Sequence, residues 1–168
     1  QRSDYLNDVL EAYHPHFFNN INNLFFIVLT QSCDLARRDG KPCSSPYITL
    51  GAVRSLDFVI EQKVNELSTS GLPLNFPLFS NRASSQYQQF LQRLFNNNEN
   101  DLFYLHHEPS KEFPVDCCAI LRLSVPIKIE HYNKCLEARI LALQDEFRAL
   151  LGWKYGHIYS RVATTDWP

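Results

Sequence analysis

Methionine is missing from this chain of 168 residues, and glycine is scarce, with five in all. The length fits a single domain. Because position 1 is not methionine either, we expect residues 1–168 to be part of a longer chain. The scarcity of glycine argues against a glycine-rich loop that cradles a phosphate. The spacings GxxxxGK(S/T), GxGxxG and GxSxG do not occur in the sequence. Motifs typical of P-loop, dinucleotide-binding and serine-hydrolase proteins are therefore absent.

Long apolar runs and an excess of one charge are missing as well. The longest apolar run, residues 24–29, has the length of a strand, and no basic segment followed by an apolar one marks a secretory signal. The net charge of −2 argues against broad coating of nucleic acid or anionic membrane by charge alone. The five cysteines form no CxxC pair, and their number is odd. We therefore expect reduced thiols in a cytoplasmic protein that does not bind a membrane.

What the sequence does contain is enough apolar surface for a core: 45% of its residues are hydrophobic, with 12 Phe and 8 Tyr. Hydrophobic periodicity predicts helices over residues 4–13, 56–67, from Ser84 or Ser85 to about 95, and along the C-terminal part of the chain. Strands are predicted over residues 24–30, 47–53, 102–106 and 117–125. Helices and strands do not alternate strictly. We expect an α+β fold: a small, mostly antiparallel, partly open β-barrel with helical insertions and a C-terminal helical segment.

Several finer expectations concern packing. Residues 24–30 are continuously apolar, as in a strand buried on both faces, and Pro126 is expected to end the long strand or place it at an edge. Gly152 and Gly156 lie one helical turn apart, which would permit close backbone packing. A C-terminal helical stripe is expected at Tyr132, Leu136, Ile140 and Leu143.

Polar and reactive residues directly follow the first predicted strand: Gln31, Ser32, Cys33 and Asp34. Such positions suit chemistry or ligand binding because a rigid strand fixes them. Asp34 would act as a general base or metal ligand, and Cys33 would be a nucleophile if its pKa were lowered. The structural alternative is that Asp34 caps the next turn and Cys33 packs as a small apolar side chain. Both readings stay open at this point.

The basic loop that follows, with Arg37 and Arg38, would contact phosphates or form ordinary solvated surface. Near the C-terminus, Tyr159, Arg161 and Asp166 would bind a ligand, with Arg161 holding an anion through two hydrogen bonds. Alternatively, Arg161 and Asp166 would form an ion pair that pins the chain end. We expect the cluster at residues 31–34 to meet this end of the chain, brought there by the last helix, in one concave surface.

Two histidines and an aspartate near the third and fourth predicted strands are further candidates. His106 and His107 are expected to point to opposite faces of a strand, so that only one joins a given site. Asp116 would join Asp34 in a site for Mg²⁺, or simply cap the end of a strand.

A zinc site has little support from spacing. Its ligands would be Cys33, Cys43, one of the two histidines and Cys117, and this arrangement matches no familiar zinc motif.

Two sequence signatures resemble those of a family of uncharacterised bacterial proteins. One is QSCDL at residues 31–35, and the other is YSRVATTDW at residues 159–167, preceded by FRALLGW at residues 147–153. The resemblance implies a bacterial origin and a gene neighbourhood of mobile elements and phage defence. The strand pattern is loosely similar to the small barrels of PemK/MazF-type toxins, which cleave RNA.

Two functions are consistent with these observations. The first is a recognition domain of a bacterial defence or toxin-like system that binds nucleic acid, a nucleotide-like ligand or a protein partner. The second is a metal-dependent nuclease or other hydrolase that uses Asp34 and Asp116, with Mg²⁺ as the cofactor.

Overall fold

A computed structural model of the protein describes residues 4–36, 43–68 and 80–159. Four strands in these residues form one antiparallel sheet of order β1-β2-β4-β3. The strands are β1 (Phe25–Val28), β2 (Tyr47–Ser55), β3 (Leu102–Leu105) and β4 (Cys117–Lys128). The sheet does not close on itself, since β1 and β3 each have one neighbour. The α+β class and the open, antiparallel sheet expected from the sequence are confirmed.

The long strands β2 and β4 form the centre of the sheet and carry most of its buried side chains. Apolar residues on β2 alternate between the two faces, with Ile48 and Leu50 packed in one cluster and Val53 in another. A register shift at Gly51/Ala52 marks a bulge between β2 and β4. Two-sided burial of this kind requires helices on both faces of the sheet.

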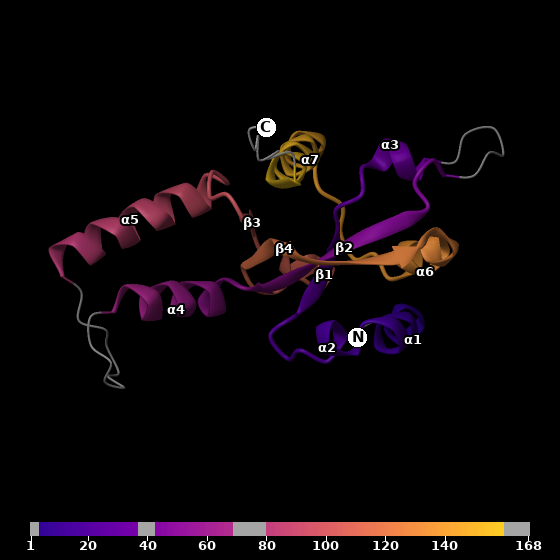
Figure 1. The fold of residues 1–168 in the computed structure, drawn as a ribbon, viewed down its shortest axis with the longest axis horizontal. Coiled ribbons are helices and arrows are strands. Elements are labelled where there is room, and N and C mark those ends of the chain that lie inside the picture. The colour runs from indigo at the N-terminus through magenta and orange to yellow at the C-terminus, as the bar shows by residue number, and fades with distance from the viewer. Residues whose placement is uncertain (1–3, 37–42, 69–79, 160–168) are drawn as a thin grey trace, which may run out of the picture.

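Helices from both ends of the chain cover the two faces (Figure 1). One face packs against α1 (Asp4–Tyr13), α2 (Pro15–Phe18) and α6 (Tyr132–Glu137), whose apolar side chains join those of Ile48 and Leu50. The other face is covered by α7 (Asp145–Tyr159), whose Leu151 and Ile158 are buried against it. The N-terminal and C-terminal helices thus sandwich the sheet between them.

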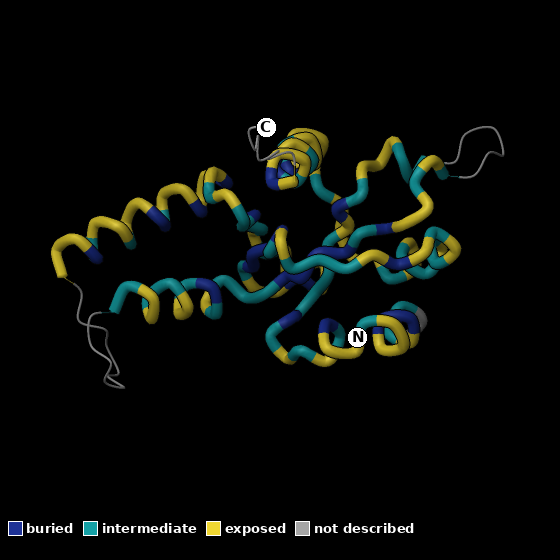
Figure 2. Tube along the Cα trace, in the orientation of Figure 1, coloured by how far each residue is buried: buried dark blue, intermediate teal, exposed yellow. Residues whose placement is uncertain are grey.

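Two helices, α4 (Leu56–Leu67) and α5 (Asn81–Phe95), form an arm that extends away from the sheet (Figure 1). The Ser55 side chain accepts a hydrogen bond from the Phe58 amide and so begins α4, and Ser80 begins α5 in the same way. Buried positions of the arm face inward, while most of its other residues are exposed (Figure 2). The remaining helical turns are α3 (Ser32–Leu35), η1 (Pro109–Lys111) and η2 (Ile129–His131).

Strand β1 lies at the edge of the sheet and is only half buried, so the expectation of a strand buried on both faces is wrong. Pro126 does not end β4, which continues to Lys128. Because β3 pairs with β4 only as far as Ile120, Pro126 lies where β2 is the sole partner of β4 in the described sheet. Proline is tolerated there because the backbone N–H group that it lacks is not needed for a hydrogen bond to another strand.

Two expectations about the C-terminal part are also corrected. Helix α6 ends at Glu137, so Ile140 and Leu143 do not continue its apolar stripe. A Cβ atom placed on Gly152 or Gly156 would meet no atom within 4 Å beyond the adjoining residues and the local helix backbone. These two glycines of α7 therefore do not mediate close backbone packing.

Candidate functional site

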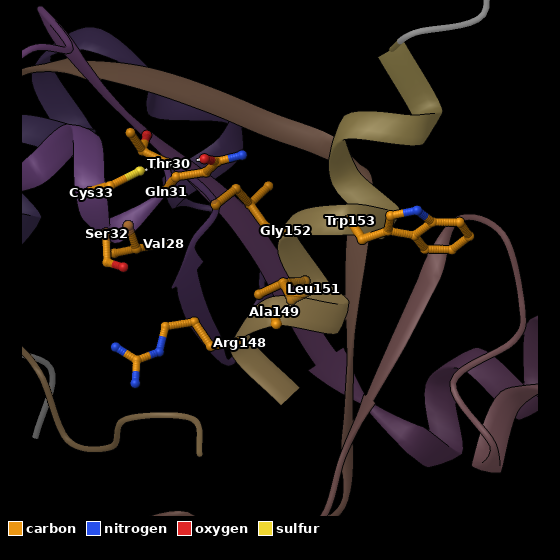
Figure 3. Close-up of a pocket in the computed structure, with 11 residues that line it drawn as sticks. Val28, Thr30, Gln31, Ser32, Cys33, Arg148, Ala149, Leu151, Gly152 and Trp153 are labelled. Carbon is orange, nitrogen blue, oxygen red and sulfur yellow. Dashed lines mark hydrogen bonds between the residues drawn. The ribbon is translucent and has the colours of Figure 1, made fainter. Parts of the chain in front are cut away.

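A groove of about 270 Å³ lies between the end of β1 and the first half of α7 (Figure 3). One wall is formed by residues 28–33, and the other comes from α7, more than one hundred residues later in the sequence. Its lining residues are Val28, Leu29, Thr30, Gln31, Ser32, Cys33, Arg148, Ala149, Leu151, Gly152 and Trp153. The structure thus brings the polar segment after the first strand together with the last helix.

Backbone hydrogen bonds fix the first wall of this groove. The Leu29 amide donates to the Thr49 carbonyl at 2.8 Å, and the Thr30 hydroxyl accepts from the Thr49 amide at 2.7 Å. Both bonds attach the chain beyond β1 to the central strand β2. Gln31 is extended, and the short helix α3 begins immediately after it. This turn brings Ser32 and Cys33 to the groove.

The second wall is positioned by the buried side of α7. Leu151 and Ile158 pack into the core, which leaves Arg148, Ala149 and Gly152 along the groove. Arg148 extends to the side of the helix on which Ser32 and Cys33 lie in Figure 3, whereas the indole of Trp153 extends away from the loop, on the far side of the helix. Trp153 therefore borders the groove where its chain passes, and its indole lies outside it.

Three polar groups of the groove have partners: the Thr30 hydroxyl bonds to Thr49, and Arg148 and Cys33 are paired as follows. Arg148 forms an ion pair with Asp145 one turn earlier on α7. The Cys33 thiol donates to Oε1 of Gln31 at 3.5 Å. The Trp153 side chain is 67% exposed, and its ring lies parallel to that of His157 with the centroids 5.4 Å apart. The groove therefore combines apolar and polar lining residues with one arginine that has an acidic neighbour, and an exposed indole lies across α7 from it.

Other sequence-predicted site residues lie elsewhere. Asp34 does not line the groove; its carbonyl accepts from the Ser45 amide at 3.2 Å, and its carboxylate accepts from the Ser44 hydroxyl at 3.4 Å. Tyr159 is the exposed last residue of α7, with its ring against Tyr155. Arg37, Arg38, Arg161 and Asp166 fall outside the residues that the structure describes.

Asp34 and Asp116 do not share a site. Asp34 contacts Ser44 and Ser45, just before β2 begins, whereas the Asp116 carbonyl accepts from the Leu56 amide at 2.9 Å, just after β2 ends. Nine residues of extended chain separate these two ends of β2, which places the carboxylates on the order of 25 Å apart. One metal ion cannot bind both, so the joint Mg²⁺ site drawn from the sequence is corrected.

The two histidines do not point to opposite faces of a strand, because β3 ends at Leu105 and both lie beyond it. Nδ1 of His107 lies 2.8 Å from Oδ1 of Asp116, and Nδ1 of His106 lies 3.1 Å from the same oxygen. The strand predicted from the sequence is one residue too long, since it includes His106.

The zinc ligand set drawn from the sequence is not assembled. Among the described residues, the one group of three metal-competent side chains is His106, His107 and Asp116, which contains no cysteine. Cys43 donates to the Leu35 carbonyl at 3.2 Å, and Cys117 is fully buried.

Burial keeps three of the five cysteines in the thiol form. It raises the pKa of Cys117 and of Cys135 to about 11, and that of Cys118 to about 12. Cys33, in the groove, is the exposed thiol of the chain. Any thiol chemistry of the folded protein at neutral pH would therefore start at Cys33.

Comparison with protein-family models, with curated proteins and with solved structures finds no match to this chain. In the parts of the chain that the structure describes, no helix combines the length and the apolar character needed to cross a bilayer.

Arg148 and Trp153 were not predicted as site residues, although both lie in the segment whose sequence resembles a family signature. The available sequence signal was a tryptophan at position 153, off the helical stripe that contains Leu151 and Ile158. The structure shows that Trp153 is exposed and that the other two residues are buried. A tryptophan placed off the apolar stripe of its helix indicates a contact outside the core.

Proposed function

We propose that this chain is a recognition domain that binds a partner protein, and that the groove beside α7 receives an extended segment of that partner. The observation that carries the proposal is the groove itself, which brings apolar and polar side chains together at the end of the edge strand β1. Apolar lining residues with a few convergent polar groups are typical of binding grooves. Arg148, on the wall formed by α7, is of a residue type that contributes strongly to protein interfaces.

The edge position of β1 supports an extended ligand. Because the Leu29 amide bonds to Thr49, the alternation of antiparallel pairing turns the backbone groups of Phe26 and Val28 toward the outer side of β1. Val28 also lines the groove and is partly exposed. An extended segment that pairs with this edge would reach the groove with its next side chains, as in other complexes formed by strand addition.

Charge favours a protein over a nucleic acid. Arg148 is the one basic residue among the described residues that line the groove, and it forms an ion pair with Asp145. Affinity for a nucleic acid depends on several lysine or arginine contacts to phosphates. The described part of the lining offers too few for this mode of binding, and Asp34 and Asp116 do not share a site for a nuclease. A bacterial defence setting and a cytoplasmic location remain expectations from the sequence.

The test uses a library of random peptides displayed on phage, selected on the wild-type protein. Synthetic versions of the enriched peptides are then measured by fluorescence anisotropy against three proteins: wild type, Ala149→Arg and Ala12→Arg. Ala149 lines the groove and is exposed, and Ala12 is a matched control because it is an exposed helical alanine on α1, at the other face of the sheet. We expect Ala149→Arg to weaken binding by roughly 10-fold or more, because a long charged side chain would occupy the groove, and Ala12→Arg to leave it unchanged.

Three results would contradict the proposal. Enriched peptides that bind Ala149→Arg and the wild type equally would place recognition elsewhere. Salt-sensitive binding of single-stranded RNA or DNA that is lost in Arg148→Ala would assign the groove to a nucleic acid. RNA or DNA cleavage that is lost in a folded Asp34→Ala protein would favour the hydrolase.

A further inference from the structure

Three ligand-type side chains converge where β3 ends and β4 begins, outside the groove. Oδ1 of Asp116 lies 2.8 Å from Nδ1 of His107 and 3.1 Å from Nδ1 of His106. All three atoms lie within 4.8 Å of one another. The two imidazole rings are neighbours, with centroids 4.3 Å apart. Both histidines thus turn the same ring nitrogen toward one carboxylate.

The fold holds these atoms in place from several directions. Leu105 and Cys117 are paired in the β3–β4 register, directly beside His106 and Asp116. The chain between them is closed by the Glu108–Phe113 bridge. Asp116 is fixed on both sides, since its carbonyl accepts from the Leu56 amide and its carboxylate from the His107 amide at 2.8 Å. The carboxylate is therefore positioned by the backbone and not by the histidine rings alone.

A simple ion pair does not explain the arrangement. One imidazole is enough to pair with a carboxylate, and Oδ1 of Asp116 also accepts the His107 amide. The His106 side chain is 70% exposed, so water would satisfy its nitrogen at little cost. A cation shared by the three groups would account for both rings lying at one carboxylate oxygen.

We propose that His106, His107 and Asp116 bind a divalent transition-metal ion of the zinc type, through Nδ1 of each histidine and the carboxylate. Metal bonds of 2.0–2.1 Å in a tetrahedron place neighbouring ligand atoms about 3.3 Å apart. The observed separations of 2.8 and 3.1 Å need only a small expansion to admit the ion. Two imidazoles and one carboxylate suit Zn²⁺ and similar ions, whereas Mg²⁺ prefers oxygen ligands throughout.

The surroundings of the cluster suit a metal centre with an open coordination position. The Tyr104 hydroxyl lies 3.2 Å from Nδ1 of His106, so a bound ion would replace this contact. Three protein ligands leave the fourth tetrahedral position for water or another ligand. The exposure of His106 and His107 gives solvent access to that position.

The experiment titrates Zn²⁺ into protein that carries Cys33→Ser, because an exposed thiol would bind the ion independently. Affinity is measured by competition with a chromophoric chelator for this parent, for His106→Asn, for His107→Asn and for the control His16→Asn. His16 is exposed on α2 and lies outside the cluster. We expect about one Zn²⁺ per chain in the parent and the control. We expect each cluster variant to lose at least about 100-fold in affinity, because it lacks a ligand and disturbing only an outer-shell partner already costs about 10- to 100-fold.

A second measurement guards against loss of folding. His106 is exposed, so His106→Asn should melt as the parent does without metal. Zn²⁺ should raise the melting temperature of the parent and of His16→Asn but not that of His106→Asn. The reason is that an ion stabilises the folded state only of a protein that binds it. Absence of Zn²⁺ binding by the parent, or equal binding by the parent and both cluster variants, would overturn the proposal.

Discussion

Lys154 is a charged residue in the core, and its three hydrogen bonds explain how the core tolerates it. Its side chain lies on α7 and the residue is 6% exposed. Nζ donates to the carbonyl oxygens of Asn97, Glu99 and Leu102 at 2.7 to 2.8 Å. These bonds use all three ammonium hydrogens and attach α7 to the chain between α5 and β3. A lysine on a helix ordinarily indicates surface, so the sequence alone predicts the opposite location.

Replacement of this lysine should be costly. We expect Lys154→Met to lower the free energy of unfolding by roughly 2–4 kcal/mol, because it leaves three carbonyl groups without their donor. Lys63→Met is the control, since Lys63 forms an exposed ion pair with Glu66 and should change the free energy by less than about 1 kcal/mol. Urea denaturation at pH 7 measures both. A loss for Lys154→Met no larger than that of the control would contradict the role assigned to Lys154.

The same variant tests the titration of Lys154. Burial lowers the pKa of Lys154 from 10.5 to about 8, against the opposing effect of Glu99 and Asp101. Between these two values the unfolded chain holds a proton that the folded protein has released. The free energy of unfolding of the wild type should therefore rise relative to Lys154→Met as the pH increases from 8 to 10. A constant difference over this range would show that Lys154 does not titrate there.

The close packing of β1 and the residue after it on β2 restricts the side chain that position 51 can carry. A Cβ atom on Gly51 would lie 2.9 Å from Cδ1 of Leu29 and 3.3 Å from Cγ2 of Ile27. Leu29 is buried and cannot move freely. Gly51 therefore lets the end of β1 pack closely on the centre of the sheet, next to the groove.

Two substitutions of glycine by alanine should therefore change the free energy of unfolding in opposite directions. Gly51→Ala should lower the free energy of unfolding by about 1–2 kcal/mol through overpacking. Gly156→Ala should raise it by about 0.5–1 kcal/mol, because the new methyl group meets nothing within 4 Å and alanine suits a helix interior better than glycine. Thermal denaturation of both variants provides the comparison. Stabilisation by Gly51→Ala would show that Leu29 and Ile27 give way easily.

Element boundaries followed the sequence where local signals were unambiguous. Helix α4 spans residues 56–67 as predicted, because Ser55 caps it and its apolar stripe is regular. Helix α5 begins at Asn81, earlier than predicted, since Ser80, Ser84 and Ser85 are equally suitable caps by residue type. The edge position of β1 could not be predicted, because an apolar run looks the same in a central strand and in an edge strand covered by helices.

At the scale of the whole molecule, the fold gives the five cysteines different degrees of exposure to solvent. Cys33 is exposed in the groove, and Cys43 and Cys135 are partly buried. Cys117 and Cys118 lie on the central strand β4 with no exposed surface. Their different surroundings come from chain segments far apart in sequence.

Alkylation should follow this order. With iodoacetamide at pH 8, Cys33 should react first and Cys43 more slowly. Cys117, Cys118 and Cys135 should react only when the protein unfolds, because burial raises the pKa of each to about 11 or 12. Peptide mapping by mass spectrometry at successive times measures the order, and Cys33→Ser should remove the fast phase. Labelling of Cys118 as fast as Cys33 would contradict the packing described here.

The sequence by itself determined the α+β class, most helices and strands, and the polar segment that follows the first strand. These features depend on periodicity and capping, which act over a few neighbouring residues. Only the tertiary structure decided which segments meet: residues 31–33 with α7, His106 and His107 with Asp116, and Lys154 with the carbonyl groups beyond α5. Such contacts form because apolar faces must be buried together and buried polar groups must be paired. Both requirements are satisfied by the whole chain at once, so no local pattern contains them.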